Sequence, residues 1–314
     1  MYSKRAKYNY RSYLRRKRLI FSAGALIVAG IVITASVQLA GRFFGAVKSD
    51  RKELLRFWEA GSYSEVYSRS HAALVSRPLD YFLLTMNGFS AYQLAISQVN
   101  SINAAAYFDN CIWSLRKALL LKNALHDGRL YYVLGKAYHY KDEAFVDLSV
   151  KYLEKARELS YNAKDIPEYL GLAYAAIGDY RSSVAAFAEA LGSDGETGSS
   201  GLLLLSIARS YYALDELEIA RAYLQRCIDV SPDSRTILSA RLLLSEVLRK
   251  AGDNEGAKKQ LVDILEEAGE NAEARYQLGE IYALQGESAR ARAEWRLALR
   301  ADPAHSKTRA RLSL

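Results

Sequence analysis

The fold is decided by residues 272–305, which read AEARYQLGEIYALQGESARARAEWRLALRADPAH. Small and apolar residues recur in this stretch at spacings of three and four, which predicts two amphipathic helices. Gly286 separates the two runs and can end the first helix, whereas Pro303 follows the second run and blocks a further turn because it lacks an amide hydrogen. The stretch therefore predicts one helical hairpin of 34 residues.

The same hairpin pattern returns along the chain with a period near 34 residues. Leu278-Gly279 opens the last copy, and Leu170-Gly171 opens an earlier one. Further landmarks are Tyr282, Ala291, Trp295 and Ala298 in the last copy, and Tyr174, Phe187 and Ala190 in the earlier one. Seven units are expected, near 47–80, 81–126, 128–163, 164–197, 201–234, 238–271 and 272–305, followed by a tail at 306–314. The unit at 81–126 fits loosely and is expected to contain a long insertion around 97–106.

These landmarks resemble the tetratricopeptide repeat, whose signature runs L-G-x-x-Y, then A-x-x-x-F, then P. The pattern has a packing reason, because Gly on the first helix and Ala on the second allow the two helices to approach closely. The resemblance covers about 50–305. It implies an all-α protein in which stacked hairpins over 42–305 form a right-handed superhelix, with a concave groove lined by the first helix of each unit.

The resemblance also implies that partner proteins bind in this groove. Carried over by position, the lining residues are Phe89, Tyr92, Tyr132, Lys136, His139, Tyr140, Arg209, Tyr212, Glu246, Arg249, Tyr276 and Glu280. Aromatic and Arg side chains are effective anchors because they bury a large area at a modest cost in entropy. The alternative for each residue is that it packs between helices. The basic and Asn residues that clamp a C-terminal carboxylate in the co-chaperone branch are not matched, so that class of partner is not expected.

The excess positive charge of the chain lies in one short tail. Residues 1–18 hold eight Lys and Arg and no acid, which leaves 35 basic and 35 acidic residues in the rest of the chain. A balanced body excludes a generally basic nucleic-acid-binding protein. Four tyrosines lie among the cations of the tail. We interpret the tail as a cytoplasmic topology signal with tyrosines at the lipid interface, and nucleic-acid binding by the tail is the alternative.

Leu19 to Gly41 contains no charged residue over 23 positions. A helix of this length spans about 34 Å, enough to cross the hydrocarbon core of a bilayer. Eight basic residues precede the segment and four follow it up to position 52, so the positive-inside rule places the N-terminus in the cytoplasm. The alternative is a cleaved signal peptide, whose apolar region is normally shorter, about 7–15 residues. We expect a single-pass inner-membrane protein with a periplasmic solenoid that could form a homo-oligomer.

No catalytic, cofactor-binding or metal-binding constellation is expected. The four histidines, His71, His126, His139 and His305, lie in different units. Cys111 and Cys227 lie three units apart, too far for a disulfide, and are expected to be buried free thiols. Residues 192–201, GSDGETGSSG, hold a Gly at every third position. A phosphate cradle would need a preceding strand and a following Lys, so a flexible loop or hinge is predicted instead.

Two functional hypotheses follow. The first is a non-enzymatic, membrane-anchored scaffold that binds partner proteins during assembly of a bacterial envelope complex, such as a flagellar motor collar, a secretion system or a cell-wall complex. The second is a periplasmic chaperone beside the translocon or the outer-membrane assembly machinery. A scaffold binds one folded partner stoichiometrically, whereas a chaperone binds many unfolded segments weakly.

The orientation can be tested with protease added outside the inner membrane. We expect digestion of the helical body and protection of the basic tail, because the tail is held in the cytoplasm by its eight cations. The measurement is immunoblotting with one tag at each end of the chain. Protection of the body would contradict the orientation.

Overall fold

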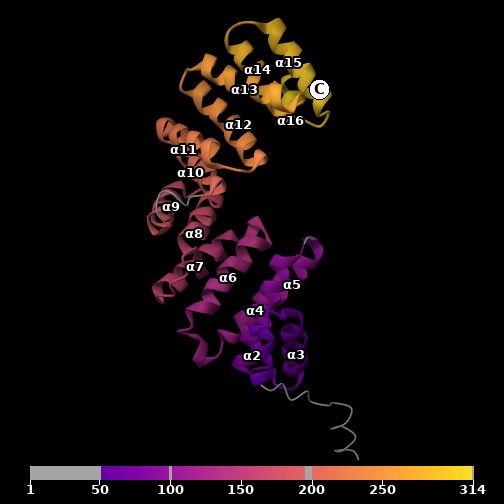
Figure 1. The fold of residues 1–314 in the computed structure, drawn as a ribbon, viewed down its shortest axis with the longest axis vertical. Helices are drawn as coiled ribbons and strands as arrows, with labels where there is room; N and C mark the ends of the chain where they lie inside the picture. Colours follow the sequence, from indigo (N-terminus) through magenta and orange to yellow (C-terminus); the bar gives the residue numbers. More distant parts are fainter. Residues whose placement is uncertain (1–50, 99–100, 195–199, 313–314) are drawn as a thin grey trace, which may run out of the picture. The chain divides into compact units, whose positions relative to one another are not determined.

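The structure, a computed structural model, describes residues 51–98, 101–194 and 200–312. These residues form fifteen α-helices and two short 3-10 helices, and no strand occurs among them (Figure 1). The helices are α2 (Arg51–Glu59), α3 (Tyr63–Ser76), α4 (Tyr81–Ser97), α5 (Ser101–Ala118), α6 (Gly128–Lys141), α7 (Val146–Glu158), α8 (Ile166–Ala176), α9 (Tyr180–Asp194), α10 (Gly201–Ala213), α11 (Leu217–Val230), α12 (Ser234–Lys250), α13 (Asn254–Ala268), α14 (Ala272–Leu284), α15 (Ser288–Ala301) and α16 (Ser306–Arg311). The 3-10 helices are η1 (Lys122–Ala124) and η2 (Glu143–Phe145). The all-α prediction is confirmed.

The chain divides into two compact units, and the boundary between Ser90 and Ala91 lies inside α4. The first unit contains α2, α3 and the beginning of α4. The side-chain amide of Asn87 donates to the Ser70 hydroxyl at 3.1 Å and to the Tyr67 carbonyl at 3.2 Å. These buried hydrogen bonds hold α4 against α3.

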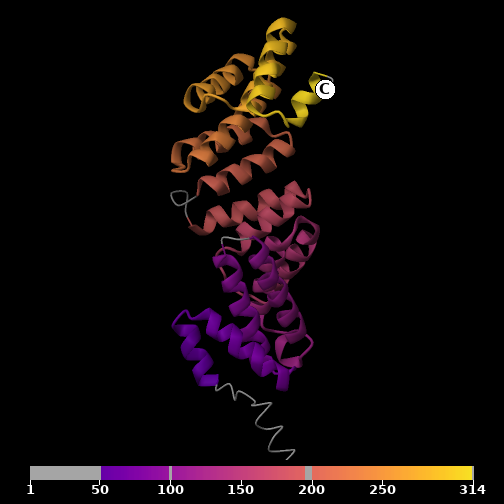
Figure 2. The same ribbon diagram turned by 90° about the vertical axis from the view of Figure 1, so that its right-hand side faces the viewer.

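The second unit is a series of helical hairpins, α6/α7, α8/α9, α10/α11, α12/α13 and α14/α15, in which each helix packs against its neighbours in the chain (Figure 2). Leu and Ala side chains between successive hairpins form the core, for example Leu204, Leu224, Leu244, Leu261 and Leu278. Each hairpin therefore buries its apolar faces against the hairpins on either side, which is how solenoids are stabilised. The solenoid expectation is confirmed.

The Leu-Gly landmarks mark the closest approach of the two helices in a hairpin. A Cβ atom on Gly171 would lie 2.4 Å from Phe187 Cδ1, and one on Gly279 would lie 2.4 Å from Trp295 Nε1. The aromatic landmark thus covers the glycine of its own hairpin. Any side chain at either glycine would push the aromatic ring, and with it the second helix, away.

In two hairpins a serine hydroxyl on the second helix donates a hydrogen bond to the carbonyl of the landmark glycine on the first helix. Ser183 donates to the Gly171 carbonyl at 2.8 Å, twelve residues back, and Ser149 donates to the Gly135 carbonyl at 2.8 Å, fourteen residues back. The two extra residues belong to the longer connection that contains η2. The longer connection therefore leaves the packing between the helices unchanged.

One sequence expectation needs correction. Around 97–106 we expected a long insertion, but α4 continues to Ser97 and α5 begins at Ser101, so most of this stretch is helical. α4 and α5 have 17 and 18 residues.

The two ends of the Gly-rich stretch 192–201, predicted to be a flexible loop or hinge, belong to helices. Gly192 lies within α9, and Gly201 is the buried first residue of α10, which Ser200 caps by accepting from the Leu203 amide. Residues 195–199 lie outside the described residues. Phe187 packs in one cluster with Leu203 and Ile207, so α9 and α10 are in direct contact on either side of this stretch.

The two cysteines are buried and free, as expected. Burial raises the pKa of the Cys111 thiol. The Cys227 thiol donates to the Gly201 carbonyl at 3.1 Å. Both thiols therefore act as small core residues.

The expected tail 1–18 and the expected membrane span 19–41 lie outside the described residues. Among the helices of 51–98, 101–194 and 200–312, none is both long and apolar enough to cross a membrane. At the other end, 306–314 was expected to be a tail, but Ser306–Arg311 form α16, which packs against α15.

The close approach at Gly279 predicts a measurable cost for a single methyl group. Gly279→Ala should lower the free energy of unfolding by about 1–3 kcal/mol, because Trp295 must move. Gly192→Ala is the matched control, since its Cβ would meet nothing within 4 Å and Ala is the better helix former. Urea titrations followed by circular dichroism measure both variants. Equal stability of the two variants would contradict the packing role of Gly279.

Candidate functional site

Ten of the twelve residues predicted to line the groove lie on the first helices of hairpins, and the other two lie on α4. α4 carries Phe89 and Tyr92, α6 carries Tyr132, Lys136, His139 and Tyr140, α10 carries Arg209 and Tyr212, α12 carries Glu246 and Arg249, and α14 carries Tyr276 and Glu280. Five of them, Tyr92, Tyr132, Lys136, His139 and Tyr140, lie close together around the Lys136 ammonium group or beside it. We call these five, with Asp165 and Tyr169, the Lys136 cluster.

Lys136 is held at the centre of this cluster by one carboxylate and three rings. Its Nζ donates to Asp165 Oδ2 at 2.7 Å and to the Tyr132 hydroxyl at 3.0 Å. Nζ also lies 4.3 Å from the ring centroid of Tyr169, 5.0 Å from that of Tyr132 and 5.9 Å from that of Tyr92. Burial alone would lower the pKa of Lys136, but the hydrogen bonds to Asp165 and Tyr132 outweigh burial and raise it. Lys136 is therefore a fixed positive charge.

The tyrosine hydroxyls of the cluster stay protonated. Burial raises the pKa of Tyr132 to about 12, and burial together with the hydrogen bond to Tyr169 raises that of Tyr140 to about 12. The Tyr132 hydroxyl donates to Asp165, and the Tyr140 and Tyr169 hydroxyls lie 2.6 Å apart. Because one hydroxyl of the latter pair donates to the other, the second retains a hydrogen to offer to a ligand.

His139 is a neutral member of the cluster. Burial and the nearby Lys136 charge lower its pKa. Its ring packs edge-on against Tyr140 and Tyr169 at centroid distances of 5.3 Å. Among the described residues its buried Nδ1 has no hydrogen-bond partner. His139 thus contributes an aromatic wall.

Asp165, Tyr169 and Phe108 were missed by the sequence reasoning. Phe108 stacks on Tyr140 at 5.8 Å, and Asp165 and Tyr169 lie at the start of α8, the first helix of the next hairpin. The spacing along the chain could have identified Asp165 and Tyr169 as neighbours of the predicted residues. Tyr140 and Tyr169 are 29 residues apart, and Tyr132 and Asp165 are 33 residues apart. Residues nearly one period apart meet across consecutive first helices.

The other predicted residues lie elsewhere. Phe89 belongs to the first unit, where its ring lies 6.4 Å from that of Trp58. Arg209 is exposed on α10, and the Tyr212 ring lies 5.1 Å from Lys250 Nζ. Lys250 also pairs with Asp215 at 2.6 Å.

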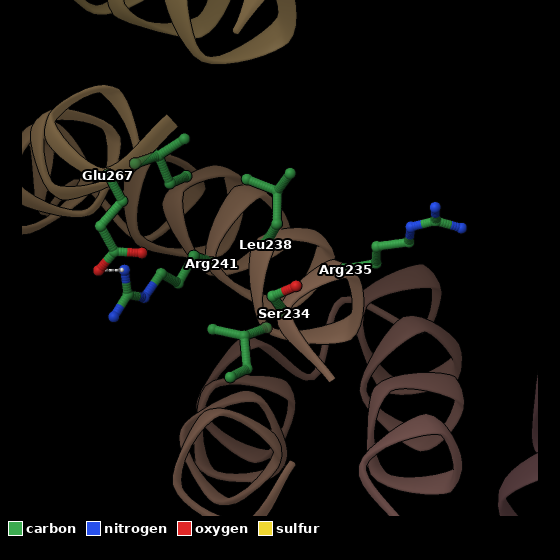
Figure 3. Close-up of a pocket in the computed structure, with 7 residues that line it drawn as sticks. Ser234, Arg235, Leu238, Arg241 and Glu267 are labelled. Carbon is green, nitrogen blue, oxygen red and sulfur yellow. Dashed lines mark hydrogen bonds and ion pairs between the residues drawn. The ribbon is translucent and has the colours of Figure 1, made fainter. Parts of the chain in front are cut away.

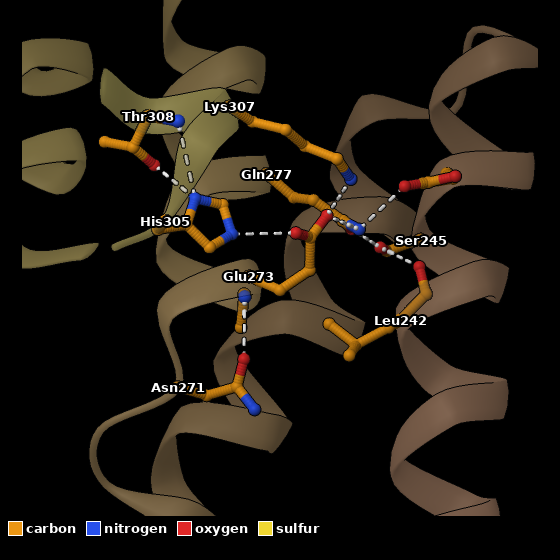
Figure 4. A network of polar contacts seen from close by, with 10 residues as sticks. Leu242, Ser245, Asn271, Glu273, Gln277, His305, Lys307 and Thr308 are labelled. Carbon is orange, nitrogen blue, oxygen red and sulfur yellow. Dashed lines mark hydrogen bonds and ion pairs between the residues drawn. The ribbon is translucent and has the colours of Figure 1, made fainter. Parts of the chain in front are cut away.

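A second polar network lies at the C-terminal end, around Glu273 and Gln277 (Figure 4), and it includes the predicted residue Glu246. Gln277 Nε2 donates to Glu246 at 3.0 Å and to Glu273 at 3.1 Å. Glu273 also accepts from Lys307 at 2.9 Å, and Tyr276 packs against the His305 ring at 5.5 Å. Glu280 accepts from Arg311 Nε at 2.8 Å. Tyr276 and Glu280 are therefore in contact with the chain's own C-terminal segment.

A hollow of about 440 Å³ lies between the start of α12 and α13 (Figure 3). Arg241 and Glu267 form an ion pair of 2.6 Å in it, and Leu238 and Ile264 supply its apolar lining. None of the twelve predicted residues lines this hollow. Within the described ranges, no group of three or more His, Cys, Asp or Glu side chains is placed to hold a metal ion.

Residues 172–314 match the sequence profile of a family described as a tetratricopeptide repeat-like domain. No curated protein matches the chain. Among solved structures, the C-terminal part of a tetratricopeptide repeat-containing protein from Cytophaga hutchinsonii is 14% identical, covers 82% of this chain and 98% of its own length, and has a TM-score of 0.57. The type IV pilus biogenesis factor PilW is 17% identical over 72% of this chain and 98% of its own, with a TM-score of 0.56. A tetratricopeptide repeat protein from Parabacteroides merdae is 14% identical over 86% and 98%, with a TM-score of 0.51.

The pairing of Lys136 with Asp165 predicts a stability effect that depends on pH. Asp165→Asn should cost about 2 kcal/mol at neutral pH, because Lys136, only 12% exposed, loses its counter-charge. Since the folded state raises the pKa of Lys136 above 10.5, its contribution is present below that pH and is lost as the pH rises through the raised pKa. The difference from the unchanged protein should therefore shrink above pH 10.5.

Glu158→Gln is the control for this experiment. Glu158 pairs with Lys155 at 2.6 Å, but both side chains are largely exposed, so its loss should change stability by less than about 0.5 kcal/mol. Urea titrations at pH 7, 9 and 11 provide the measurement. A cost for Asp165→Asn no larger than that of the control would show that the pair does not organise the cluster.

Proposed function

With the tetratricopeptide fold as the premise, we propose that this protein is a non-enzymatic scaffold that binds a partner protein on its first-helix face, at the Lys136 cluster. We further propose that Leu19 to Gly41 anchors it in the inner membrane of a bacterium, with the N-terminus in the cytoplasm and the solenoid in the periplasm. Its role there is the assembly of an envelope complex.

The observation that carries this proposal is the concentration of tyrosines around one fixed charge. Tyr140 is 46% exposed, although its ring packs against Phe108, His139 and Tyr169. Rings held in place by neighbours lose little entropy when a partner covers them, and they bury a large area. The protonated hydroxyls add hydrogen bonds of defined direction. Such a surface suits one complementary partner.

The same rigidity favours the scaffold over the chaperone. A protein that holds many unfolded segments needs an adaptable surface, such as flexible apolar side chains that can repack. Lys136, Tyr132 and Asp165 instead fix one another by hydrogen bonds of 2.7–3.0 Å. A surface with one arrangement of charge discriminates among partners.

The chemistry of the cluster also supports a binding role. An amine nucleophile must lose its proton, and the raised pKa of Lys136 keeps it charged. His139, the natural general base, has no hydrogen bond from its Nδ1 to any described group that it could activate. The charged Lys136 is therefore suited to binding a partner.

The membrane anchor and the periplasmic location rest on the sequence. They are supported by 23 uncharged residues at 19–41 and by the eight cations that precede them. A periplasmic body restricts the partners to envelope proteins.

The binding surface can be tested by recovering partners from detergent-solubilised native membranes. Tyr140→Ala should reduce recovery of the main partner about tenfold or more, because hot-spot aromatics contribute about 2 kcal/mol. Trp113→Ala is the matched control, since Trp113 is 56% exposed on α5, a helix that the sequence assigns as the second of its unit. Quantitative mass spectrometry compares the variants at equal helicity.

The outcomes separate the hypotheses. One partner at a fixed stoichiometry that is lost with Tyr140→Ala supports the scaffold. Many partners at low occupancy would support the chaperone instead. Full recovery with Tyr140→Ala combined with loss with Trp113→Ala would move the binding surface to the second helices.

A further inference from the structure

The first-helix face at the C-terminal end is acidic, and a basic segment of the same chain lies on it. Lys307 Nζ donates to Glu273 Oε1 at 2.9 Å, and Arg311 Nε donates to Glu280 Oε1 at 2.8 Å. Lys307 and Arg311 are one turn apart on α16, and Glu273 and Glu280 are two turns apart on α14. The face is therefore complementary in charge to a helix that carries cations at this spacing.

The acidic side chains are held in place before any ligand arrives. Gln277 is buried, and its amide donates to both Glu246 and Glu273 (Figure 4). Its carbonyl accepts from the Ser245 hydroxyl. One buried amide thus fixes two carboxylates on neighbouring first helices, at the positions that a cationic ligand would meet.

The hold of α16 on this face is mostly electrostatic. Thr308 is its only buried residue, and Lys307 and Arg311 are 54% and 53% exposed. Exposed ion pairs contribute about 0–1 kcal/mol each. The His305 ring and Lys307 add contacts with the Tyr276 ring at 5.5 and 5.7 Å. A competing segment with better contacts can therefore replace α16.

Glu246 forms no ion pair with the resident segment among the described residues. Among the contacts of the described residues, Glu246 accepts a hydrogen bond only from Gln277. Burial raises the pKa of Glu246, whereas the charges of Lys307 and Arg249 act in the opposite direction. A longer basic segment would pair with Glu246 as well as with Glu273 and Glu280.

We propose that Glu246, Glu273, Tyr276 and Glu280 form a second binding site, for a basic helical segment of a partner protein, and that α16 is its resident occupant. This inference rests on the proposed scaffold function and assigns it a further partner chemistry. The site is separate from the Lys136 cluster, so a partner segment with cations one turn apart binds here by displacing α16.

A peptide of residues 303–314 is the probe, labelled for fluorescence anisotropy and added to the purified full-length chain. Lys307→Glu combined with Arg311→Glu repels the chain's own α16 while it retains the buried Thr308. This variant should bind the peptide at least tenfold more tightly than the unchanged chain, in which α16 competes. Binding should weaken at high salt because the contacts are ionic.

A charge swap provides the specificity control. Glu273→Lys with Glu280→Lys should abolish binding of the basic peptide and allow binding of a peptide that carries the Lys307→Glu and Arg311→Glu changes. Circular dichroism and the thermal midpoint verify that each variant is folded.

Equal peptide affinity of the unchanged and α16-repelling chains would overturn the inference, as would binding that ignores the charge swap. Partner recovery through Tyr140 is measured independently. Failure of the peptide experiment with intact recovery therefore removes this site and leaves the proposed function standing.

Discussion

In the hairpins α6/α7, α8/α9 and α14/α15, the contact between a glycine on the first helix and a large side chain on the second determines how the two helices pack. Phe187 lies over Gly171, and Trp295 lies over Gly279, at distances that exclude even a methyl group. Leu153 occupies the same place over Gly135. Because one face of α6, α8 and α14 is used in this way, the other side chains of these helices are directed to the neighbouring hairpins and to the surface. The proposed binding surface consists of first-helix side chains that do not pack inside their own hairpin.

Stacking then brings together residues that are about one repeat apart. Tyr132 meets Asp165, Tyr140 meets Tyr169, and Glu246 meets Gln277, at separations of 33, 29 and 31 residues. These contacts lie between consecutive first helices. A polar cluster therefore needs residues from two hairpins, and its geometry depends on how closely the hairpins pack. Loosening the glycine contacts should disturb these clusters without any change in their own residues.

The helical class and the Leu-Gly landmarks could be predicted from the sequence, because spacing and small residues have direct packing consequences. Tyr92, Tyr132 and Lys136 were identified as groove residues by position, and the structure places them together. Asp165 was missed because an acid before a helix has an ordinary capping role. The contacts of Tyr276 and Glu280 with the final helix could not be predicted, because nothing in the short 306–314 segment indicated a helix. Local sequence patterns predict where helices begin and end. Contacts between residues of different hairpins depend instead on the repeat period and on the position of the final helix, α16.

Site-specific photocrosslinking in cells tests the central claim most directly. A photoreactive amino acid placed at Tyr140, on the first-helix face, is compared with the same amino acid placed at Trp113, on a second helix. The account predicts a discrete crosslinked partner from position 140 and none from position 113. Crosslinks from position 113 alone would contradict it.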